Sequence, residues 1–233
     1  MTEKAELEWR NEDVPFSSRF DDTYFSKAGG REETNYVFVQ GNGLEQRMTQ
    51  VSSLVVAELG FGSGLNFYET VLHLRRLPKD TRPELTFISF ELYPMAEDEI
   101  RKTIRPWPEL MPVAEEVLCH WQLTQGWMEV ALEDVTLCLG VGDANELIKT
   151  MPKAADAWYL DGFNPSKNPE LWSEELLRAV FDQTNEQGTF ATYTAAGWVR
   201  RNLQAAGFAV ERAKGFGTKR EMLKGRKIAG PSS

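Results

Sequence analysis

The feature that most constrains the fold is a regular alternation of short apolar strands with helical segments that begins at residue 54. The run LVVAEL (54–59) is followed by NFYETVLHLRRL (66–77), in which apolar side chains recur at helical spacing. Such alternation predicts an α/β fold with a doubly wound, mostly parallel sheet. Further strands are expected at 85–90, 135–140, 156–160, 189–194, 208–212 and 220–226, and further helices at 95–104, 107–118, 144–151, 173–184 and 197–206.

The two ends of the chain depart from this alternation. Only a loop separates the last two expected strands, which predicts an antiparallel hairpin on the C-terminal edge of the sheet. Near the other end, YVFVQGNGLEQRM (36–48) places β-rich runs around a Gly-Asn-Gly turn and predicts an N-terminal β-hairpin. We therefore expect a β extension or lid over 1–53, one domain over 54–227 and a flexible tail over 228–233.

The charge is unevenly distributed along the chain. The 233 residues have a formal net charge of −9, whereas residues 200–227 hold nine Lys or Arg and two Glu, a local charge of +7. A basic face on an acidic body can hold nucleic acid locally, and a solvated charged edge is the alternative.

The composition also bears on the cellular location of the protein and on whether it binds a metal ion. Cys119 and Cys138 form no CxxC pair and the chain has two histidines, so we expect no metal site. No run of about 18 apolar residues is present, and the N-terminal MTEKAELEWR is charged. These observations predict a cytoplasmic protein without a membrane segment.

The loop after the first expected strand, ELGFGSG (58–64), contains three alternating glycines. Glycine there lets the backbone approach a ligand bound beyond the carboxyl ends of the strands. A P-loop is excluded because no lysine follows the last glycine, and GxGxxG fails because Leu65 or Phe67 stands at its third glycine position. The remaining pattern, ExGxGxG, resembles the first motif of class I methyltransferases that use S-adenosylmethionine. Its residues are Glu58, Gly60, Gly62 and Gly64.

Two acids follow later strands at corresponding positions. Glu91 comes directly after the strand at 85–90, where a carboxylate can accept hydrogen bonds from both hydroxyls of a ribose. Asp143 follows the strand at 135–140, where methyltransferases commonly place a polar residue against the adenine amino group. Either acid alone is also an ordinary turn or N-cap residue.

The fourth strand of the class I order leads into DGFNPSKNPELW (161–172). A loop at this position faces the cofactor's methyl group, and its prolines restrict the backbone. An amine is mostly protonated at pH 7, so Asp161 could orient it and help it lose a proton. The alternative is a rigid surface loop that caps the next helix.

Six separated motifs extend the resemblance to a particular family. They are similar to the methyltransferase portion of the MnmC family of bacterial tRNA-modifying enzymes, including the stand-alone members called MnmD. The motifs are RFDDTYFS (19–26), YVFVQGNGL (36–44), ELGFGSGLNF (58–67), FISFELYP (87–94), WYLDGFNPSKNPELW (158–172) and GFGTKREMLKG (215–225).

The resemblance implies methyl transfer from S-adenosylmethionine to the aminomethyl nitrogen of 5-aminomethyl-2-thiouridine at the tRNA wobble position. Asp161 is then the catalytic residue facing the amine. A second, FAD-dependent domain follows in bifunctional members, but this chain contains no GxGxxG and we expect no FAD site in it. The cofactor-binding residues implied are Tyr24, Glu58, Gly60, Gly62, Gly64, Asn66, Glu91 and Asp143.

An anticodon loop presents unstacked bases and phosphates. Aromatic candidates for stacking and basic candidates for phosphate contacts are Phe163, Trp172, Tyr193 and Phe216, and Arg200, Arg201, Lys219 and Arg220. Two other functions remain open on the residues alone. One is methylation of a small amine, which predicts a closed pocket without a basic rim. The other is a catalytically silent nucleic-acid-binding module.

Overall fold

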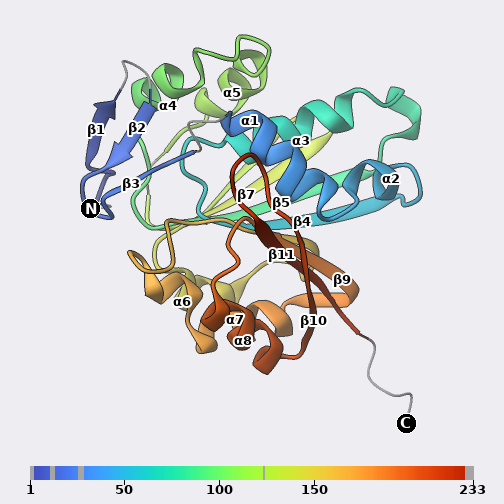
Figure 1. Cartoon of the computed structure of the whole chain (residues 1–233). Helices are drawn as coiled ribbons and strands as arrows, with labels where there is room; N and C mark the ends of the chain where they lie inside the picture. Colours follow the sequence, from blue (N-terminus) through green and yellow to red (C-terminus); the bar gives the residue numbers. More distant parts are fainter. Residues whose placement is uncertain (1–2, 11–13, 26–28, 123, 229–233) are drawn as a thin grey trace.

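The computed structural model describes residues 3–10, 14–25, 29–122 and 124–228. At its centre is a mixed sheet in the order β10-β11-β9-β8-β4-β5-β7-β6 (Figure 1). Five strands in the middle of the sheet are parallel to one another: β4 (Ser53–Leu59), β5 (Glu84–Glu91), β7 (Val135–Val141), β8 (Ala155–Leu160) and β9 (Thr184–Thr192). The antiparallel strands are β6 (Gly126–Ala131), β10 (Phe208–Lys214) and β11 (Glu221–Lys227).

The strand order reverses beside β4. From β4 the chain crosses to β5 and then β7 on one side, and it returns to β8 on the other side of β4. The loops after β4 and β8 therefore diverge at the carboxyl edge of the sheet. In doubly wound folds a ligand binds in the crevice that this reversal opens.

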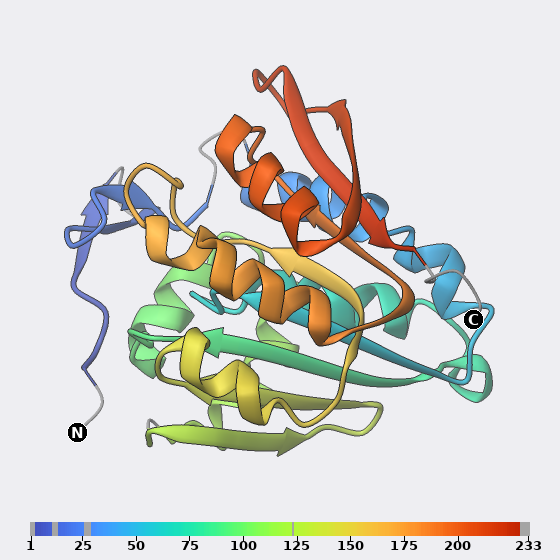
Figure 2. The same ribbon diagram turned by 90° about the horizontal axis from the view of Figure 1, so that it is seen from below.

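Helices cover both faces of the sheet (Figures 1 and 2). The N-terminal helical elements and α3, α4 and α5 lie on one face, and α6, α7 and α8 lie on the other. Their bounds are α1 (Gly30–Glu33), η1 (Thr34–Gln40), α2 (Leu44–Met48), α3 (Leu65–Arg75), η2 (Lys79–Thr81), α4 (Glu97–Ile104), α5 (Met111–Leu118), α6 (Ala144–Leu147), η3 (Ile148–Thr150), η4 (Pro169–Trp172), α7 (Glu174–Asp182) and α8 (Gly197–Ala206).

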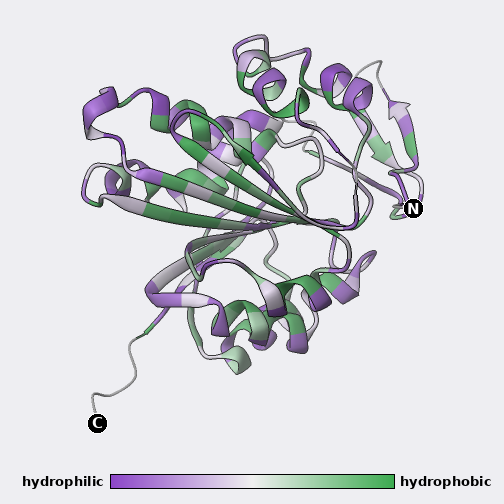
Figure 3. Cartoon of the chain, turned by 180° about the vertical axis from the view of Figure 1, so that it is seen from behind, coloured by the Kyte–Doolittle hydropathy of each residue, from purple (hydrophilic) through white to green (hydrophobic). Residues whose placement is uncertain are grey.

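Two apolar cores result, one on each face of the sheet. Successive residues of β4 alternate between them: Val56 packs into the core under α3, and Ala57 packs into the core under α7 and α8. Figure 3 shows long hydrophobic stretches on the central strands and hydrophilic residues on the outer turns of the helices. The same alternation directs Glu58 to the α3 side, where Asn66 and Ser89 hydrogen-bond to it within an otherwise apolar core.

The N-terminal part contains a small antiparallel sheet beside the carboxyl edge of the large one (Figures 1 and 2). Its strands are β1 (Leu7–Arg10), β2 (Val14–Ser17) and β3 (Asp22–Thr23), in the order β1-β2-β3. An N-terminal β-hairpin therefore exists, formed by β1 and β2.

The hairpin expected at 36–48 is wrong, because this segment is helical in η1 and α2. Val37, Phe38 and Val39 are all buried, which a half-exposed strand does not allow but a segment packed on α3 and β9 does. Gly41 lies against the helix, where an added Cβ would be 1.9 Å from the Val37 carbonyl oxygen. The Gly-Asn-Gly run thus turns the chain between two helical segments.

The remaining elements agree closely with the sequence. The predicted α/β class, the mostly parallel doubly wound sheet and the antiparallel edge hairpin, β10 with β11, are confirmed. Several helices are shorter than expected, and the largest differences are in α5, which begins at Met111, and in α6, which gives way to η3 at Ile148. The edge strand β6 was not predicted, because its residues are mostly half-exposed. Of the expected tail, 229–233 lies outside the described residues. Among the helices described, none has the length and apolar character needed to cross a bilayer.

Candidate active site

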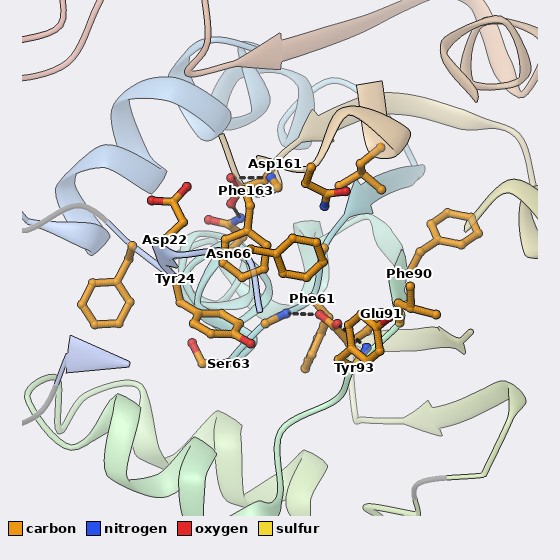
Figure 4. Close-up of a pocket in the computed structure, with 18 of the residues that line it drawn as sticks. Asp22, Tyr24, Phe61, Ser63, Asn66, Phe90, Glu91, Tyr93, Asp161 and Phe163 are labelled. Carbon is orange, nitrogen blue, oxygen red and sulfur yellow. Dashed lines mark hydrogen bonds between the residues drawn. The ribbon is translucent and has the colours of Figure 1, made fainter. Parts of the chain in front are cut away.

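A cavity of about 790 Å³ lies at the carboxyl edge of the sheet, where the strand order reverses (Figure 4). Its volume is within the range of sites that hold a cofactor-sized molecule. The loops after β4, β5, β7, β8 and β9, the N-terminal segment and the tip of the β10–β11 hairpin contribute to its wall. Of the residues that the sequence singles out, Tyr24, Gly60, Gly62, Asn66, Glu91, Asp143, Asp161, Phe163, Tyr193 and Lys219 line it.

The glycine loop follows β4 and needs its glycines for conformation. Gly60, Gly62 and Gly64 have φ values of 91°, 55° and 82°, in the left-handed region that side chains with a Cβ rarely adopt. A Cβ on Gly62 would also be 3.2 Å from Tyr24 Cδ1, which lies over the loop. Gly64 does not line the cavity and is the N-cap of α3.

Glu91 ties the loop after β4 to the loop after β5. Its Oε2 accepts a 2.8 Å hydrogen bond from Gly62 N, and its Oε1 accepts a 2.9 Å bond from Tyr93 N (Figure 4). Burial raises the pKa of this carboxyl, and the backbone donors oppose the shift. Each oxygen has a second lone pair, so the side chain is able to accept bonds from neighbouring hydroxyls of a ligand.

Glu58 lies beneath the cavity and is fully buried. Its carboxylate accepts hydrogen bonds of 2.8 Å from Asn66 Nδ2 and 2.7 Å from Ser89 Oγ. Burial raises its pKa well above the ordinary value. The expected direct contact of Glu58 with a cofactor does not fit this position, because the side chain does not line the cavity and instead supports Asn66 from below.

Asn66, in the first turn of α3, connects the carboxyl groups of Glu58 and Asp161. Its Nδ2 donates 2.8 Å hydrogen bonds to both Glu58 Oε1 and Asp161 Oδ2, and its Oδ1 accepts a 2.6 Å bond from Thr34 Oγ1. Both amide hydrogens therefore have partners within the protein. A contact between Asn66 and a cofactor has to use its carbonyl oxygen or follow a rearrangement.

Asp161 begins the loop after β8. Its Oδ1 accepts a 3.0 Å bond from Gly162 N, and its Oδ2 is held by Asn66. Burial, reinforced by repulsion from Glu33, raises the pKa of Asp161 to about 7, while the two donors and Lys219 oppose the shift. A carboxyl group that titrates near neutral pH is suited to accept a proton from an amine.

The N-terminal segment 19–25 lines the cavity together with the loops after β5 and β8. Phe20 stacks on Phe163 with ring centroids 4.7 Å apart, and Tyr24 meets the same ring edge-on at 5.0 Å. Asp22 Oδ2 accepts a 2.8 Å bond from Asn164 N. Burial raises the pKa of Tyr24, so its hydroxyl stays protonated. This arrangement fits the lid role expected for the motif at 19–26, of which residues 19–25 are described.

The end of the cavity near β5 and β7 combines a polar and an apolar wall. Asp143 is the N-cap of α6, where its Oδ1 accepts a 2.9 Å bond from Asn145 N, and it also lines the cavity. Leu92 lines the same cavity with 44% of its surface exposed. An exposed leucine beside an acid suits the flat, apolar face and polar edge of a nucleobase. Leu92 was not predicted from the sequence, although it directly follows Glu91.

The opposite end, beside Asp161, is lined by aromatic and charged side chains. Tyr193 Oη donates a 2.7 Å hydrogen bond to the Gly162 carbonyl, which fixes the ring beside the loop after β8. Lys219 reaches in from the hairpin tip and forms a 2.7 Å ion pair with Glu33. Glu33 was not predicted from the sequence, because no local pattern distinguishes it from its acidic neighbour Glu32.

Several expected substrate contacts lie elsewhere. Trp172 does not fit a stacking role, because its ring is 1% exposed and its Nε1 donates a 3.1 Å bond to the Phe163 carbonyl. Arg200 and Arg201 are in α8 and do not line the cavity. Arg220 lines an adjoining shallow hollow that shares Tyr193 and Lys219 with the main cavity. Phe216 packs near Tyr36, with ring centroids 5.9 Å apart.

The residues present fit S-adenosylmethionine. The close backbone approach at the glycine loop, the Glu91 carboxylate and the Leu92–Asp143 wall provide for an amino acid part, a ribose and a base in one connected cavity. Within the ranges described, no group of three or more His, Cys, Asp or Glu side chains is arranged to hold a metal ion.

Similarities to known proteins agree with this geometry. A family model described as S-adenosyl-L-methionine-dependent methyltransferase matches residues 108–228, more than half of the chain. The bifunctional protein MnmC of Vibrio campbellii, named for tRNA 5-methylaminomethyl-2-thiouridine biosynthesis, is 43% identical over 234 residues, which cover 95% of this chain and 35% of that protein. The chain therefore spans about a third of the length of this curated relative.

Solved structures show the same fold. The crystal structure of MnmC2 from Aquifex aeolicus has a TM-score of 0.77 and 25% identity, with 99% of this chain and 73% of that chain covered. A methyltransferase from Pyrococcus furiosus has a TM-score of 0.50 and 14% identity, with 97% of this chain and 90% of that chain covered, and shows the fold alone. The resemblance to class I methyltransferases predicted from the sequence is confirmed. The chain belongs to the family of S-adenosyl-L-methionine-dependent methyltransferases.

Proposed function

We propose that this methyltransferase acts on the 5-aminomethyl group of a wobble uridine in tRNA, giving 5-methylaminomethyl-2-thiouridine or its oxygen analogue. The observation that carries the proposal is the position of Asp161, which is held by two donors on the cavity wall with a pKa of about 7. The name of the Vibrio campbellii relative supports the same product.

The reaction needs an uncharged amine aligned with the donor. S-adenosylmethionine, held by the glycine loop, Glu91 and Asp143, would supply a methyl group on a sulfonium; the new C–N bond would replace the C–S bond, whose electron pair would stay on sulfur, and the nitrogen would lose one proton. Asp161 is placed to take that proton, and Asn66 and Gly162 hold the carboxylate in one orientation. The segment 19–25 lines one side of the cavity, which limits the access of water from that side.

The rim of the cavity supports an RNA substrate. A wobble base lies in a single-stranded loop and can be turned out of its stack. Phe163 and Tyr193 line the acceptor end and are available as aromatic neighbours for the base. Lys219 and Arg220 lie beside them and are suited to phosphates. Arg201 is exposed on α8 and is a more distant candidate.

Two further features belong to this proposal. The aminomethyl group has to be exposed by an upstream step, and the bifunctional relative suggests an FAD-dependent oxidoreductase as the enzyme that provides it. A tRNA substrate also agrees with the cytoplasmic location expected from the sequence.

The test combines calorimetric titration with S-adenosylmethionine and methyl transfer to tRNA that carries 5-aminomethyl-2-thiouridine. Binding together with transfer supports the proposal down to the substrate. Binding without transfer would support the assignment as a methyltransferase but would show that the methyl acceptor is another amine, such as a small molecule. The same tRNA with an unmodified wobble uridine is the matched control, and we expect no transfer to it.

A further inference from the structure

The ammonium group of Lys219 lies inside the acceptor end of the cavity, in contact with two side chains. Its Nζ is 2.7 Å from Glu33 Oε1 and 4.1 Å from the centroid of the Tyr193 ring. All three residues line the cavity together with Asp161. A carboxylate and an aromatic face together form a recognition site for an ammonium ion.

Glu33 and Tyr193 are held more firmly by the fold than Lys219 is. The Glu33 side chain is 12% exposed, and Tyr193 is anchored by its bond to the Gly162 carbonyl. Thr34, next to Glu33, is bonded to Asn66. In contrast, the Lys219 side chain is 40% exposed and extends from the loop between β10 and β11. The receiving groups belong to the packed fold, whereas the lysine is a long side chain that enters from solvent.

Resting on the proposed function, we propose that Glu33 and Tyr193 form the subsite for the substrate's protonated aminomethyl group, and that Lys219 occupies this subsite until the substrate displaces it. The incoming group is a primary ammonium of the same kind as the lysine head group. Its arrival exchanges one ammonium for another, so Glu33 keeps a charge partner throughout. Because Asp161 lines the same wall, the substrate nitrogen is delivered next to the group that takes its proton.

The displaced lysine has a second role in this scheme. Lys219 and its neighbour Arg220 both line the adjoining hollow. Once it leaves Glu33, the Lys219 ammonium can turn toward a phosphate of the same RNA. Binding of the substrate's amine and binding of the RNA phosphate are then coupled through the Lys219 side chain.

The experiment measures affinity in the absence of S-adenosylmethionine for two anticodon stem–loop RNAs. One carries 5-aminomethyluridine and the other 5-methyluridine at the wobble position, so the ratio of their Kd values isolates the amine. We expect Glu33→Gln to lower the preference of the wild-type protein for the amine by about tenfold, because the variant lacks the charge that binds an ammonium. We expect Lys219→Met to raise the preference, since the competing ammonium is gone.

Matched controls come from the same hairpin. Glu211 and Lys224 form a 3.1 Å exposed ion pair between β10 and β11, outside the cavity. Glu211→Gln and Lys224→Met should leave the preference for the amine unchanged, although the loss of a positive charge can weaken binding of both RNAs equally.

The outcomes separate this inference from the function on which it rests. If the wild-type protein does not methylate tRNA that carries 5-aminomethyl-2-thiouridine, the proposed function fails and this subsite fails with it. If the wild-type protein methylates that RNA and Glu33→Gln keeps the wild-type preference, only the subsite is disproved. Equal loss of affinity for both RNAs in Glu33→Gln also disproves it, because that result shows a purely structural role.

Discussion

Asn66 Nδ2 donates a 2.8 Å hydrogen bond to Asp161 Oδ2, although the two residues are 95 positions apart in the chain. The same nitrogen holds the buried carboxyl group of Glu58. An amide does not titrate, so it can orient a carboxyl group without fixing its protonation state. Asp161 is thus held in place while it remains free to gain and lose a proton near neutral pH.

Replacement of Asp161 tests its part in the reaction. We expect Asp161→Ala to reduce turnover by a factor of about 10² or more, because the nitrogen loses its proton acceptor. The affinity for S-adenosylmethionine should remain close to that of the wild-type protein, since Glu91 and the glycine loop are untouched. Turnover by single-turnover assay and affinity by calorimetry give the two values. Near-normal turnover would remove Asp161 from any catalytic role.

The pH dependence of the reaction should follow the same group. With a pKa of about 7, Asp161 is mostly protonated at pH 6, so kcat/KM should rise with pH, reach its midpoint near pH 7 and level off at about pH 8. Asn66 stabilises the charged form. Asn66→Leu should therefore move the inflection to higher pH. A pH profile of the variant that overlays the wild-type profile would contradict the assignment.

The same shift has a consequence for stability. A carboxyl group whose pKa is higher in the folded state than in the unfolded state favours folding at low pH, and this contribution is lost as the pH rises through the folded pKa. For Asp161 the loss should lie between about pH 4 and pH 7. We expect the gain in Tm from Asp161→Asn, relative to wild type, to be larger at pH 8 than at pH 4. A pH-independent difference in Tm would refute the raised pKa.

Glu91 is predicted to control cofactor affinity. Glu91→Ala removes the acceptor of both the Gly62 and the Tyr93 N–H groups, so the loops after β4 and β5 lose this side-chain link and keep only the backbone bonds of Gly60 and Phe61 to the Phe90 carbonyl. We expect the Kd for S-adenosylmethionine to rise by about tenfold or more, measured by calorimetry. Glu84→Ala, at the opposite end of the same strand and exposed, is the matched control. Equal affinities in the two variants would exclude the assigned role.

Trp172 should behave as a core residue. Trp172→Phe removes the 3.1 Å bond to the Phe163 carbonyl and leaves a cavity, so we expect a loss of about 1–3 kcal/mol in the free energy of unfolding. Urea denaturation measures this loss. The affinity of the folded variant for tRNA should change little. A selective loss of RNA affinity without a loss of stability would restore the stacking role.

The sequence predicted the parts of the site that depend on where strands end. Glu91 and Asp161 follow apolar runs whose limits are readable, so their meeting at one edge of a parallel sheet could be inferred. Glu33 could not be found in this way, because its significance comes from Lys219, 186 positions away. The Val37–Val39 run was misread for a related reason, since packing on both of its sides, not its own periodicity, decides its conformation.

The contact between Glu33 and Lys219 also determines when, during synthesis of the chain, the acceptor end of the cavity can form. A chain leaving the ribosome exposes Glu33, the glycine loop and Glu91 long before the β10–β11 hairpin has been synthesised. The wall at the acceptor end of the cavity is therefore incomplete in any nascent chain that does not yet include Lys219. This methyltransferase thus acquires its acceptor pocket only after the β10–β11 hairpin has been synthesised.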